Sequence, residues 1–424
     1  MPPSLKIIVA NPAIPPHVQQ TVIAYDEAGY LSLFFTSFVE HPDYRLSRLL
    51  KKISVLKKDL DRRSFHFLPI NKLVLLSLPE LIRTFSARKL NPLVTDFIWE
   101  WSELKFDRWV SRKLGGCHVS AVHTYEHAAL ATLTKARKLN IFSVHEQPSQ
   151  HHTFFDKIAR QQLAIYPELK SAATELLINK KAQKRNKRRD KELELASLII
   201  CNSTFTRRTL IDGGVEASKI SVIPLSFPPV IADKKPIKKN SPMIFLYAGN
   251  QSIRKASHIL YEAWRRCAFK DEDAELWLVG KMLLPGSLRE NLPGKVVIKD
   301  NIPHGDLMKL YQQVDVFVLP SLADGFGMVV TEAMSQNVPV IASENCCGPD
   351  IITHMKDGWI VPAGEPQMLA NQLIWCLNHK TEVATAGENA RQKALSWQWS
   401  DYRRRLAEVV LEQWKKFQTA KASA

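Results

Sequence analysis

The sequence predicts an α/β protein of two domains, the second of them built around a doubly wound parallel β-sheet. Three observations carry this prediction. The chain has 424 residues, more than one common domain holds. Its composition, 45% apolar and 24% charged, is that of a globular protein with an ample core. In its second half, short apolar runs alternate with helical patterns, as they do in sheets with helices on both faces.

The N-terminal domain is expected over residues 1–231. Its strands are predicted from apolar runs that end in turn residues, at residues 5–10, 31–38, 119–123, 141–145, 198–202 and 220–224. Helical patterns lie between them, at residues 17–28, 126–139, 154–194 and 205–212. Residues 44–114 are mostly helical in pattern and rich in Lys and Arg. This stretch is too long to connect two strands, so we interpret it as a basic helical insertion.

A linker is expected at residues 232–241, which are charged and lack a periodic pattern. The C-terminal domain follows over residues 242–396. Its strands are predicted at residues 244–248, 275–279, 296–299, 316–319 and 339–342. The tail, residues 397–424, contains an amphipathic helix over 399–417, which we expect to cross back to the N-terminal domain.

Bulk properties limit the possible functions. The six cysteines form no CxxC pair and no zinc-ligand spacing, which favours buried thiols in a reducing compartment. We find no signal peptide and no apolar run near the roughly 20 residues of a membrane-spanning helix, so a cytoplasmic protein is expected. The formal charge of +16 indicates an anionic partner: nucleic acid, a membrane surface or a phosphorylated substrate.

The most informative stretch is PSLADGFGMVVTEAMSQNVPVIA, residues 320–342. A strand ends there, a loop holds Asp324, and Gly325-Phe326-Gly327 opens a helix that contains Glu332. An anion at this helix start would meet free backbone N–H groups and the positive dipole end. The two acids lie about 12 Å apart along such a helix. This layout suits a nucleotide-sugar, whose diphosphate lies between two hydroxylated rings; an ordinary loop with solvent-facing acids is the alternative.

Residues 244–400 resemble, in order, the C-terminal domain of the retaining glycosyltransferase family 4. Asp324 to Glu332 is similar to the acidic-x7-acidic motif of that family, which usually has Glu at both ends. The family's downstream segment is matched by Gly348-Pro349-Asp350, Asp357-Gly358 and Val361-Pro362. Its first strand and basic loop are matched by Tyr247-Ala248-Gly249 and Arg254-Lys255. Asn250 stands where many members have Arg, and Ala256 where Gly usually follows the lysine.

This resemblance implies the GT-B fold, in which two Rossmann-like domains face a central cleft. It also implies retaining, metal-independent transfer from a nucleotide-sugar donor to a glycan or lipid-linked acceptor, in polysaccharide, glycolipid or cell-envelope glycan synthesis. Arg254 and Lys255 would neutralise the diphosphate, Asp324 would contact the transferred sugar, and Glu332 the ribose. The donor-binding residues that it implies are Gly249, Arg254, Lys255, Ile302, Asp324, Gly325, Phe326, Gly327 and Glu332, with Asn250 as a further candidate.

The N-terminal half carries a shorter resemblance. Residues 194–227 resemble the last strand-helix-strand unit of the family's N-terminal domain, whereas residues 11–17 replace its glycine-rich first loop. In the family, a histidine after an inner strand commonly faces the transferred sugar. His145 fits this position and completes an implied catalytic set with Asp324 and Lys255. The alternatives are His17, His123, His151 and His152, and for each histidine a structural or surface role stays open.

No metal ligands are predicted. His151 and His152 are adjacent, so their side chains are not expected to share a face, and no third ligand is placed. Asp59-x-Asp61 and Asp271-x-Asp273 match the DxD metal motif of other transferases but lie in charged, exposed segments. Because the family works without a metal, neither a metal nor another cofactor is expected.

Two segments concentrate the positive charge. Residues 51–63 alternate cations with apolar residues, the pattern of a helix on an anionic bilayer, where each cation contributes about 1 kcal/mol. This segment predicts a peripheral enzyme on the inner face of the membrane; a helix packed on its own domain is the alternative. Residues 180–191 have Ala182 as their one apolar residue, which indicates a solvated helix face.

Two other classes of function stay open. A sugar-nucleotide epimerase or a phosphorylase has the same fold, but epimerisation needs no acceptor and phosphorolysis needs free phosphate. A non-catalytic basic module that binds nucleic acid is the other class. It rests on charge alone, because residues 180–191 interleave no aromatic residues and no nucleic-acid-binding fold is recognised. Nucleic acid is therefore not an expected partner.

Overall fold

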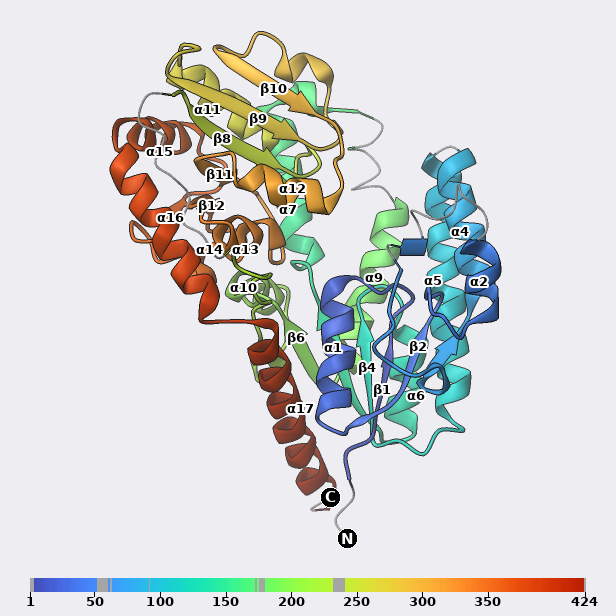
Figure 1. Cartoon of the computed structure of the whole chain (residues 1–424). Coiled ribbons are helices and arrows are strands. Elements are labelled where there is room, and N and C mark those ends of the chain that lie inside the picture. Colours follow the sequence, from blue (N-terminus) through green and yellow to red (C-terminus); the bar gives the residue numbers. More distant parts are fainter. Residues whose placement is uncertain are drawn as a thin grey trace.

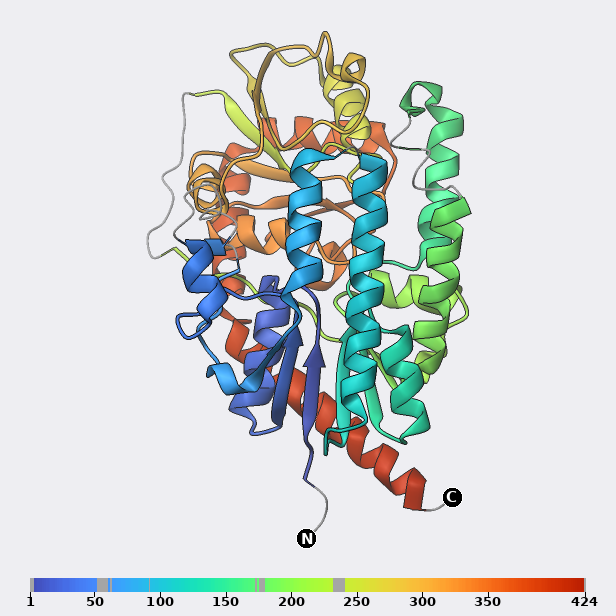
Figure 2. The ribbon, with the colours of Figure 1, turned by 90° about the vertical axis from the view of Figure 1, so that its right-hand side faces the viewer.

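The computed structural model describes residues 4–51, 60–61, 63–90, 92–171, 174, 180–231 and 241–422. They form two α/β domains, one above the other in Figure 1, and the chain crosses between them again before its C-terminal helix. Each domain is built on a sheet whose strand pairs are all parallel. Helices flank both sheets (Figures 1 and 2). The predicted fold class is confirmed.

The N-terminal sheet has seven strands in the order β3-β2-β1-β4-β5-β6-β7. The inner strands β1, β4, β5 and β6 are buried along their whole length, as strands of a parallel sheet are; β1 and β6 are apolar runs, whereas β4 and β5 also bury polar residues. The strand bounds are β1 Ile7–Ala10, β2 Leu31–Thr36, β3 Leu73–Leu75, β4 Ala121–Tyr125, β5 Phe142–Gln147, β6 Leu198–Cys201 and β7 Ile220–Val222. The strand order reverses between β1 and β4, where parallel sheets bind ligands beyond their carboxyl ends.

The helices of this domain start at recognisable signals. Pro16 stands at the first position of α1, and the Ser203 hydroxyl accepts a hydrogen bond from the Thr206 N–H at the start of α10. The α-helices are α1 Pro16–Glu27, α2 Arg45–Lys51, α4 Ser77–Lys89, α5 Pro92–Leu114, α6 Leu130–Lys138, α7 His152–Ile165, α9 Lys180–Leu195 and α10 Thr204–Asp212. Short 3₁₀ turns lie at η1 Ile70–Lys72, η2 Pro167–Leu169 and η3 Ala217–Lys219.

The expected helical insertion at residues 44–114 is partly a strand. β3 pairs in parallel with β2 and forms the edge of the sheet, so this stretch contributes to the domain core. After β3, α4 and α5 form a hairpin that rises beside the C-terminal domain (Figure 2). Residues 52–59 and 62 of the basic segment lie outside the described residues.

Helix α9 contains most of the second basic segment, which was expected to be a solvated face. Instead, Lys181, Arg185 and Arg188 form ion pairs with Asp96 and Glu100 of α5. The Arg188 guanidinium lies 3.2 Å from Glu100 Oε1. These ion pairs therefore hold α9 against the hairpin of α4 and α5.

The C-terminal sheet has six strands in the order β10-β9-β8-β11-β12-β13. Their bounds are β8 Met243–Ala248, β9 Ala274–Val279, β10 Lys295–Lys299, β11 Val316–Leu319, β12 Val340–Ser343 and β13 Gly358–Val361. The helices are α11 Ser257–Cys267, α12 His304–Tyr311, α13 Met328–Ser335, α14 Gly348–Ile351, α15 Pro366–Asn378 and α16 Lys380–Leu395, with the 3₁₀ turn η4 Gly286–Arg289. The edge strand β13 was not predicted, because four residues after a turn give little periodic signal.

The last helix, α17 Trp399–Ala422, leaves the C-terminal domain and packs along α1 (Figure 1). It buries Tyr402, Leu406, Val410 and Trp414. Among the described residues, no helix is long and apolar enough to cross a membrane. All six cysteines are unpaired, and four of them are buried.

Candidate active site

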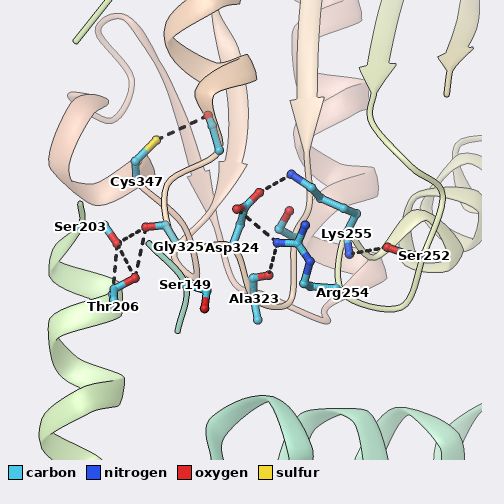
Figure 3. A network of polar contacts seen from close by, with 12 residues as sticks. Ser149, Ser203, Thr206, Ser252, Arg254, Lys255, Ala323, Asp324, Gly325 and Cys347 are labelled. Carbon is cyan, nitrogen blue, oxygen red and sulfur yellow. Dashed lines mark hydrogen bonds and ion pairs between the residues drawn. The ribbon is translucent and has the colours of Figure 1, made fainter. Parts of the chain in front are cut away.

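Two loops meet at the carboxyl edge of the C-terminal sheet. One follows β8 and the other follows β11, and these strands are neighbours in the sheet. The N–H groups of Leu322 and Ala323 both donate to the Arg254 carbonyl, at 3.0 and 3.3 Å. The basic loop and the acidic loop are therefore one bonded unit (Figure 3).

Asp324 lies at the centre of this unit and is 8% exposed. Its carboxylate pairs with the Lys255 ammonium through Oδ2 and with the Arg254 guanidinium through Oδ1, the latter at 3.3 Å (Figure 3). Burial alone would raise the pKa of Asp324, but Lys255 and Arg254 outweigh it and lower the pKa below its usual value. The acid is therefore ionised at neutral pH. The sequence predicted all three residues, and the fold brings them together.

Helix α13 begins directly after this cluster. Gly327 precedes it with φ 82°, a left-handed conformation that favours glycine, and a β-carbon there would lie 2.9 Å from Leu319. The Phe326 ring is buried in the domain core, so Phe326 can offer only its backbone to a ligand. The Asp324 N–H is held by the Asn345 carbonyl at 2.9 Å. This geometry fixes the acid beside the first turn of α13.

Glu332 lies one turn into α13 and is 7% exposed. Its Oε1 is 3.0 Å from His304 Nε2, and its Oε2 accepts a hydrogen bond from the Tyr311 hydroxyl at 3.3 Å. The hydrogen bond to Glu332 raises the pKa of His304. Sequence reasoning missed His304 and Tyr311, although the predicted Ile302 stands two residues before His304. The sequence signal that could have identified them is the start of a helix beyond the carboxyl end of β10, because ligands bind at that edge of a parallel sheet.

The first predicted donor residues, Gly249 and Asn250, follow β8. A β-carbon on the neighbouring Gly280 would lie 2.2 Å from the Gly249 carbonyl oxygen, so these two strand ends touch backbone to backbone. Asn250 is exposed, and its carbonyl accepts a hydrogen bond from the Tyr247 hydroxyl at 3.0 Å. Ala256, where glycine is usual, has φ 54°, which explains that preference.

A cavity of about 320 Å³ opens beside the basic loop. Phe155 and Thr174 line it from the N-terminal domain, and the remaining lining comes from the C-terminal domain. The lining residues are Phe155, Thr174, Asn250, Ser252, Ile253, Arg254, Lys255, Leu283 and Leu284. Two cations and several apolar side chains from both domains therefore surround one space.

The N-terminal domain also touches the glycine motif directly. The hydroxyls of Ser203 and Thr206 both donate to the Gly325 carbonyl, at 2.5 and 3.2 Å (Figure 3). A β-carbon on Gly325 would lie 1.7 Å from the Pro148 carbonyl oxygen. Asp350, in the predicted downstream segment, accepts a hydrogen bond from the Thr204 N–H at 3.0 Å. The domains are thus closed around this motif, and only glycine fits at position 325.

His145 lies on β5 and is 0% exposed. Its Nδ1 is 3.2 Å from the Thr124 hydroxyl, and burial lowers its pKa to about 3, so the ring is neutral. This is the environment of a core histidine, and the prediction that His145 faces the sugar stays a prediction. Among the described residues, no hydrogen bond joins it to the Asp324 cluster.

His123 and His17 belong to a second buried polar group. His123 is 0% exposed, with Nδ1 2.8 Å from the Tyr25 hydroxyl and Nε2 3.3 Å from Glu146 Oε2. His17 is partly exposed, its ring centroid lies 5.9 Å from that of Tyr125, and burial lowers its pKa. His123 lies within β4, Tyr125 ends that strand, and His17 is in the first turn of α1, which follows β1.

His151 and His152 share a face, contrary to the expectation for adjacent residues. Their ring centroids are 4.4 Å apart, because His151 is the extended residue before α7 and His152 is its first helical residue. Both rings point at Asp190 of α9. Burial, followed by His152, lowers the pKa of His151 to about 4. Of the two DxD matches, Asp61 and Asp271 are exposed as expected, Asp273 is half-buried, and Asp59 lies outside the described residues.

A known protein family matches the C-terminal half of the chain. Residues 231–393 match the family model described as glycosyl transferases group 1. The match covers the C-terminal domain, which we call the group 1 domain. It includes the Asp324 cluster, Glu332 and His304.

Curated relatives match part of the chain. A capsular polysaccharide biosynthesis glycosyltransferase, CapM of Staphylococcus aureus, is 26% identical over 36% of this chain and 42% of its own length. The chain spans about half the length, or less, of the first curated relatives that it matches.

Solved structures match the group 1 domain and the N-terminal domain together. Sucrose-phosphate synthase from Thermosynechococcus elongatus is 17% identical, with a TM-score of 0.62 over 97% of this chain and 100% of that one. Anabaena HepE in complex with UDP-glucose is 17% identical, with a TM-score of 0.57 over 96% of this chain and 100% of that one. At this identity the likeness concerns the fold, which is GT-B.

Proposed function

We propose that the protein is a glycosyltransferase that moves a sugar from a nucleotide-sugar to an acceptor hydroxyl. The observation that carries this proposal is the cluster of Asp324, Arg254 and Lys255 at the start of α13 in a group 1 domain. The likeness to CapM favours a role in polysaccharide synthesis. The likeness to HepE favours a uridine-diphosphate sugar as the first donor to test.

The two cations of this cluster, Arg254 and Lys255, can bind the diphosphate of the nucleotide that leaves during transfer. Lys255 and Arg254 neutralise Asp324 when no donor is bound, and a diphosphate would give them a second anionic partner. They would then stabilise the charge that builds on the leaving nucleotide diphosphate. The N–H groups at the start of α13 would add to this stabilisation.

The two acids suit the two ends of the donor. Asp324, once it shares its cations with the diphosphate, would accept hydrogen bonds from the transferred sugar. Glu332 is held by His304 and Tyr311 with little exposure, and it would accept hydrogen bonds from the ribose. This arrangement favours a diphosphate that bridges the space between the two carboxylates.

We further propose that transfer retains the configuration of the sugar and needs no metal. Asp324 is held by two cations, which makes its carboxylate a poor nucleophile, so the leaving phosphate would assist the acceptor on the same face of the sugar. Arg254 and Lys255 supply the positive charge that a metal ion supplies in other transferases. Proton NMR of the product anomer, in transfers with and without EDTA, tests both points.

A thermal-shift screen of nucleotide-sugars tests the donor site, because a ligand that binds the folded state raises the melting temperature. We expect one donor to raise Tm in the native protein and not in Glu332→Ala. Asp306→Ala is the matched control, since Asp306 is an exposed acid on the adjacent helix α12. Product analysis with and without acceptor then separates transfer from epimerisation or phosphorolysis. If no donor raised Tm, or if Glu332→Ala responded equally, the assignment would fail.

We propose that the enzyme is cytoplasmic and peripheral, and that it binds an anionic bilayer, where it meets a lipid-linked acceptor. On α4, Leu78, Ile82 and Phe85 recur every three or four residues, which places them on one face, and they are 68%, 39% and 64% exposed. Across the hairpin, Val94 and Phe97 of α5 are also exposed. Such an apolar face in a basic region suits a bilayer surface.

Liposome flotation at low and high salt tests this surface. Anionic vesicles should carry the native protein upward, and Ile82→Ser with Phe85→Ser should weaken this binding. Leu395→Ser is the control, because Leu395 is an equally exposed apolar residue of the C-terminal domain. Equal flotation of all three proteins would exclude the hairpin as the contact.

A further inference from the structure

Two histidines and an aspartate converge where α7 begins. His152 Nε2 lies 2.6 Å from Asp190 Oδ1, and His151 Nε2 lies 3.4 Å from the same oxygen. The ligand atoms of the three side chains all lie within 4.8 Å of one another. Asp190 comes from α9, 38 residues further along the chain, so this convergence is made by the fold.

We propose that His151, His152 and Asp190 form a binding site for a divalent transition-metal ion, with Zn²⁺ as the best match. Two imidazoles and one carboxylate are a common zinc donor set, and their atoms can move onto a shared ion about 2 Å from each. The same set is less suited to Mg²⁺ or Ca²⁺, which prefer oxygen ligands. This site is distinct from the proposed donor site and does not rest on the proposed function.

The site is open to an incoming ion. A cavity of about 300 Å³ adjoins it, lined in part by His151, Asp190, Glu194 and Glu216. The Asp190 side chain is 46% exposed, which gives the ion and a water ligand a path. Glu194 lies one helical turn beyond Asp190 on α9 and lines the same cavity, which adds a second carboxylate to the ion's path.

The His151 ring is held by its surroundings as metal-ligating rings usually are. Its Nδ1 lies 2.8 Å from the Thr153 hydroxyl. A β-carbon on Gly213 would lie 2.5 Å from the same nitrogen, so the ring packs flush against the backbone there. The Thr153 N–H also points at Nδ1, at 3.4 Å. In the metal-bound tautomer the proton would lie on Nδ1 and be donated to the Thr153 hydroxyl, which would leave the Nε2 lone pair for the ion.

Metal binding at this place would fasten α9 to the loop that meets the glycine motif. Arg189, next to Asp190, pairs with Glu126 and donates to the Ser149 hydroxyl at 3.2 Å. Ser149 follows Pro148, whose carbonyl packs against Gly325. The role that this geometry favours for the ion is structural, because it would hold this loop in place.

Isothermal titration with ZnCl₂, after EDTA treatment and dialysis, tests the proposal. We expect one Zn²⁺ per chain and an increase in Tm on binding. Asp190→Asn and His152→Gln should each weaken binding by about tenfold or more. His66→Gln is the matched control: His66 also pairs with a carboxylate, at 2.7 Å from Glu40, but the neighbouring His41 ring lies 5.9 Å away and its Nε2 is bonded to the Leu68 carbonyl instead.

Co²⁺ gives a readout that depends neither on activity nor on a variant that folds. In the native protein, a site with two imidazoles should produce the visible absorption bands of a four- or five-coordinate Co²⁺ ion, and Zn²⁺ should remove them. Absence of Zn²⁺ binding, or binding that both site variants retain at native strength, would overturn the proposal. Binding lost equally in His66→Gln would place the ion elsewhere.

Discussion

The two domains share an architecture but differ in how their polar residues are arranged. In the C-terminal domain, Asp324, Arg254 and Lys255 lie on the loops after two adjacent strands and meet in one cluster. In the N-terminal domain, the candidate histidines lie in three places: His17 near His123, His145 on β5, and His151 with His152 at the start of α7. Short sequence motifs thus determine the geometry of the site in the C-terminal domain. In the N-terminal domain, contacts between residues far apart in the sequence determine how the histidines are placed.

The largest expected effect is loss of the Lys255 cation. Lys255→Ala should lower the turnover number by about 10³-fold, roughly 4 kcal/mol, because one donor of charge stabilisation to the leaving diphosphate is removed. Steady-state kinetics with the donor identified by thermal shift measure this effect. Lys309→Ala is the control, since that side chain is 78% exposed on α12. A Lys255→Ala enzyme with native turnover would show that the cluster is structural.

The corresponding ion pair of the N-terminal domain should affect stability instead. Glu126 has a side chain only 3% exposed and pairs with Arg189. Arg189→Ala leaves this buried acid without its cation, so we expect a loss of about 3 kcal/mol in the free energy of unfolding at pH 7. Chemical denaturation measures it. Lys191→Ala, two residues away on an exposed position of α9, should leave the free energy of unfolding unchanged.

The same pair predicts a pH dependence. Burial alone would raise the pKa of Glu126, but Arg189, together with His127 and hydrogen bonds from Ser149 and Gln147, lowers the pKa to about 2 from the usual 4.5. A lowered pKa stabilises the fold above about pH 4.5, and this stabilisation is lost as the pH falls toward 2. The free energy of unfolding of Arg189→Ala should therefore fall less steeply in that interval. Parallel curves for both proteins would contradict the assignment.

The sequence could predict the C-terminal site because its signals are local. A glycine pair, an acid on either side of it and a basic loop keep their spacing whatever the rest of the chain does. His304 and Tyr311 were missed because their contact with Glu332 depends on how α12 packs against α13. The convergence of His151, His152 and Asp190 was missed for the same reason, since no periodicity links residues so far apart.

In the N-terminal half, most strands could be predicted from the sequence, but the contacts of their side chains could not. β3 was hidden in a helical, basic stretch because three residues give no alternation. His145 was chosen for its position after a strand, but β5 continues to Gln147 and encloses the ring within the sheet. The predicted strand thus ended two residues too early, and the role of His145 at the sugar stays a prediction.

Gly325 joins the two domains, and its substitution should separate them. In Gly325→Ala, the new methyl group would meet the Pro148 carbonyl at 1.7 Å, a clash of backbone with side chain that only domain opening relieves. We expect about 10²-fold lower turnover, because the N-terminal groups move away from the donor, with native-like Tm for each domain. Gly305→Ala is the control, since a β-carbon there meets nothing within 4 Å. Small-angle scattering should show the opening, and a native scattering curve with native turnover would exclude domain closure as described.

The smallest expected effect separates a core histidine from one that contacts the sugar. His145→Gln keeps a partner for the Thr124 hydroxyl but loses the ring packing of a fully buried side chain, so the free energy of unfolding should fall by about 1–2 kcal/mol. Turnover per folded molecule should change less than tenfold. If His145 faced the transferred sugar, the same substitution would lower turnover by about 10²-fold or more with little loss of stability. His17→Gln is the companion variant, because His17 is the partly exposed histidine at the same edge of the sheet, and a large effect there alone would move the sugar contact from β5 to α1.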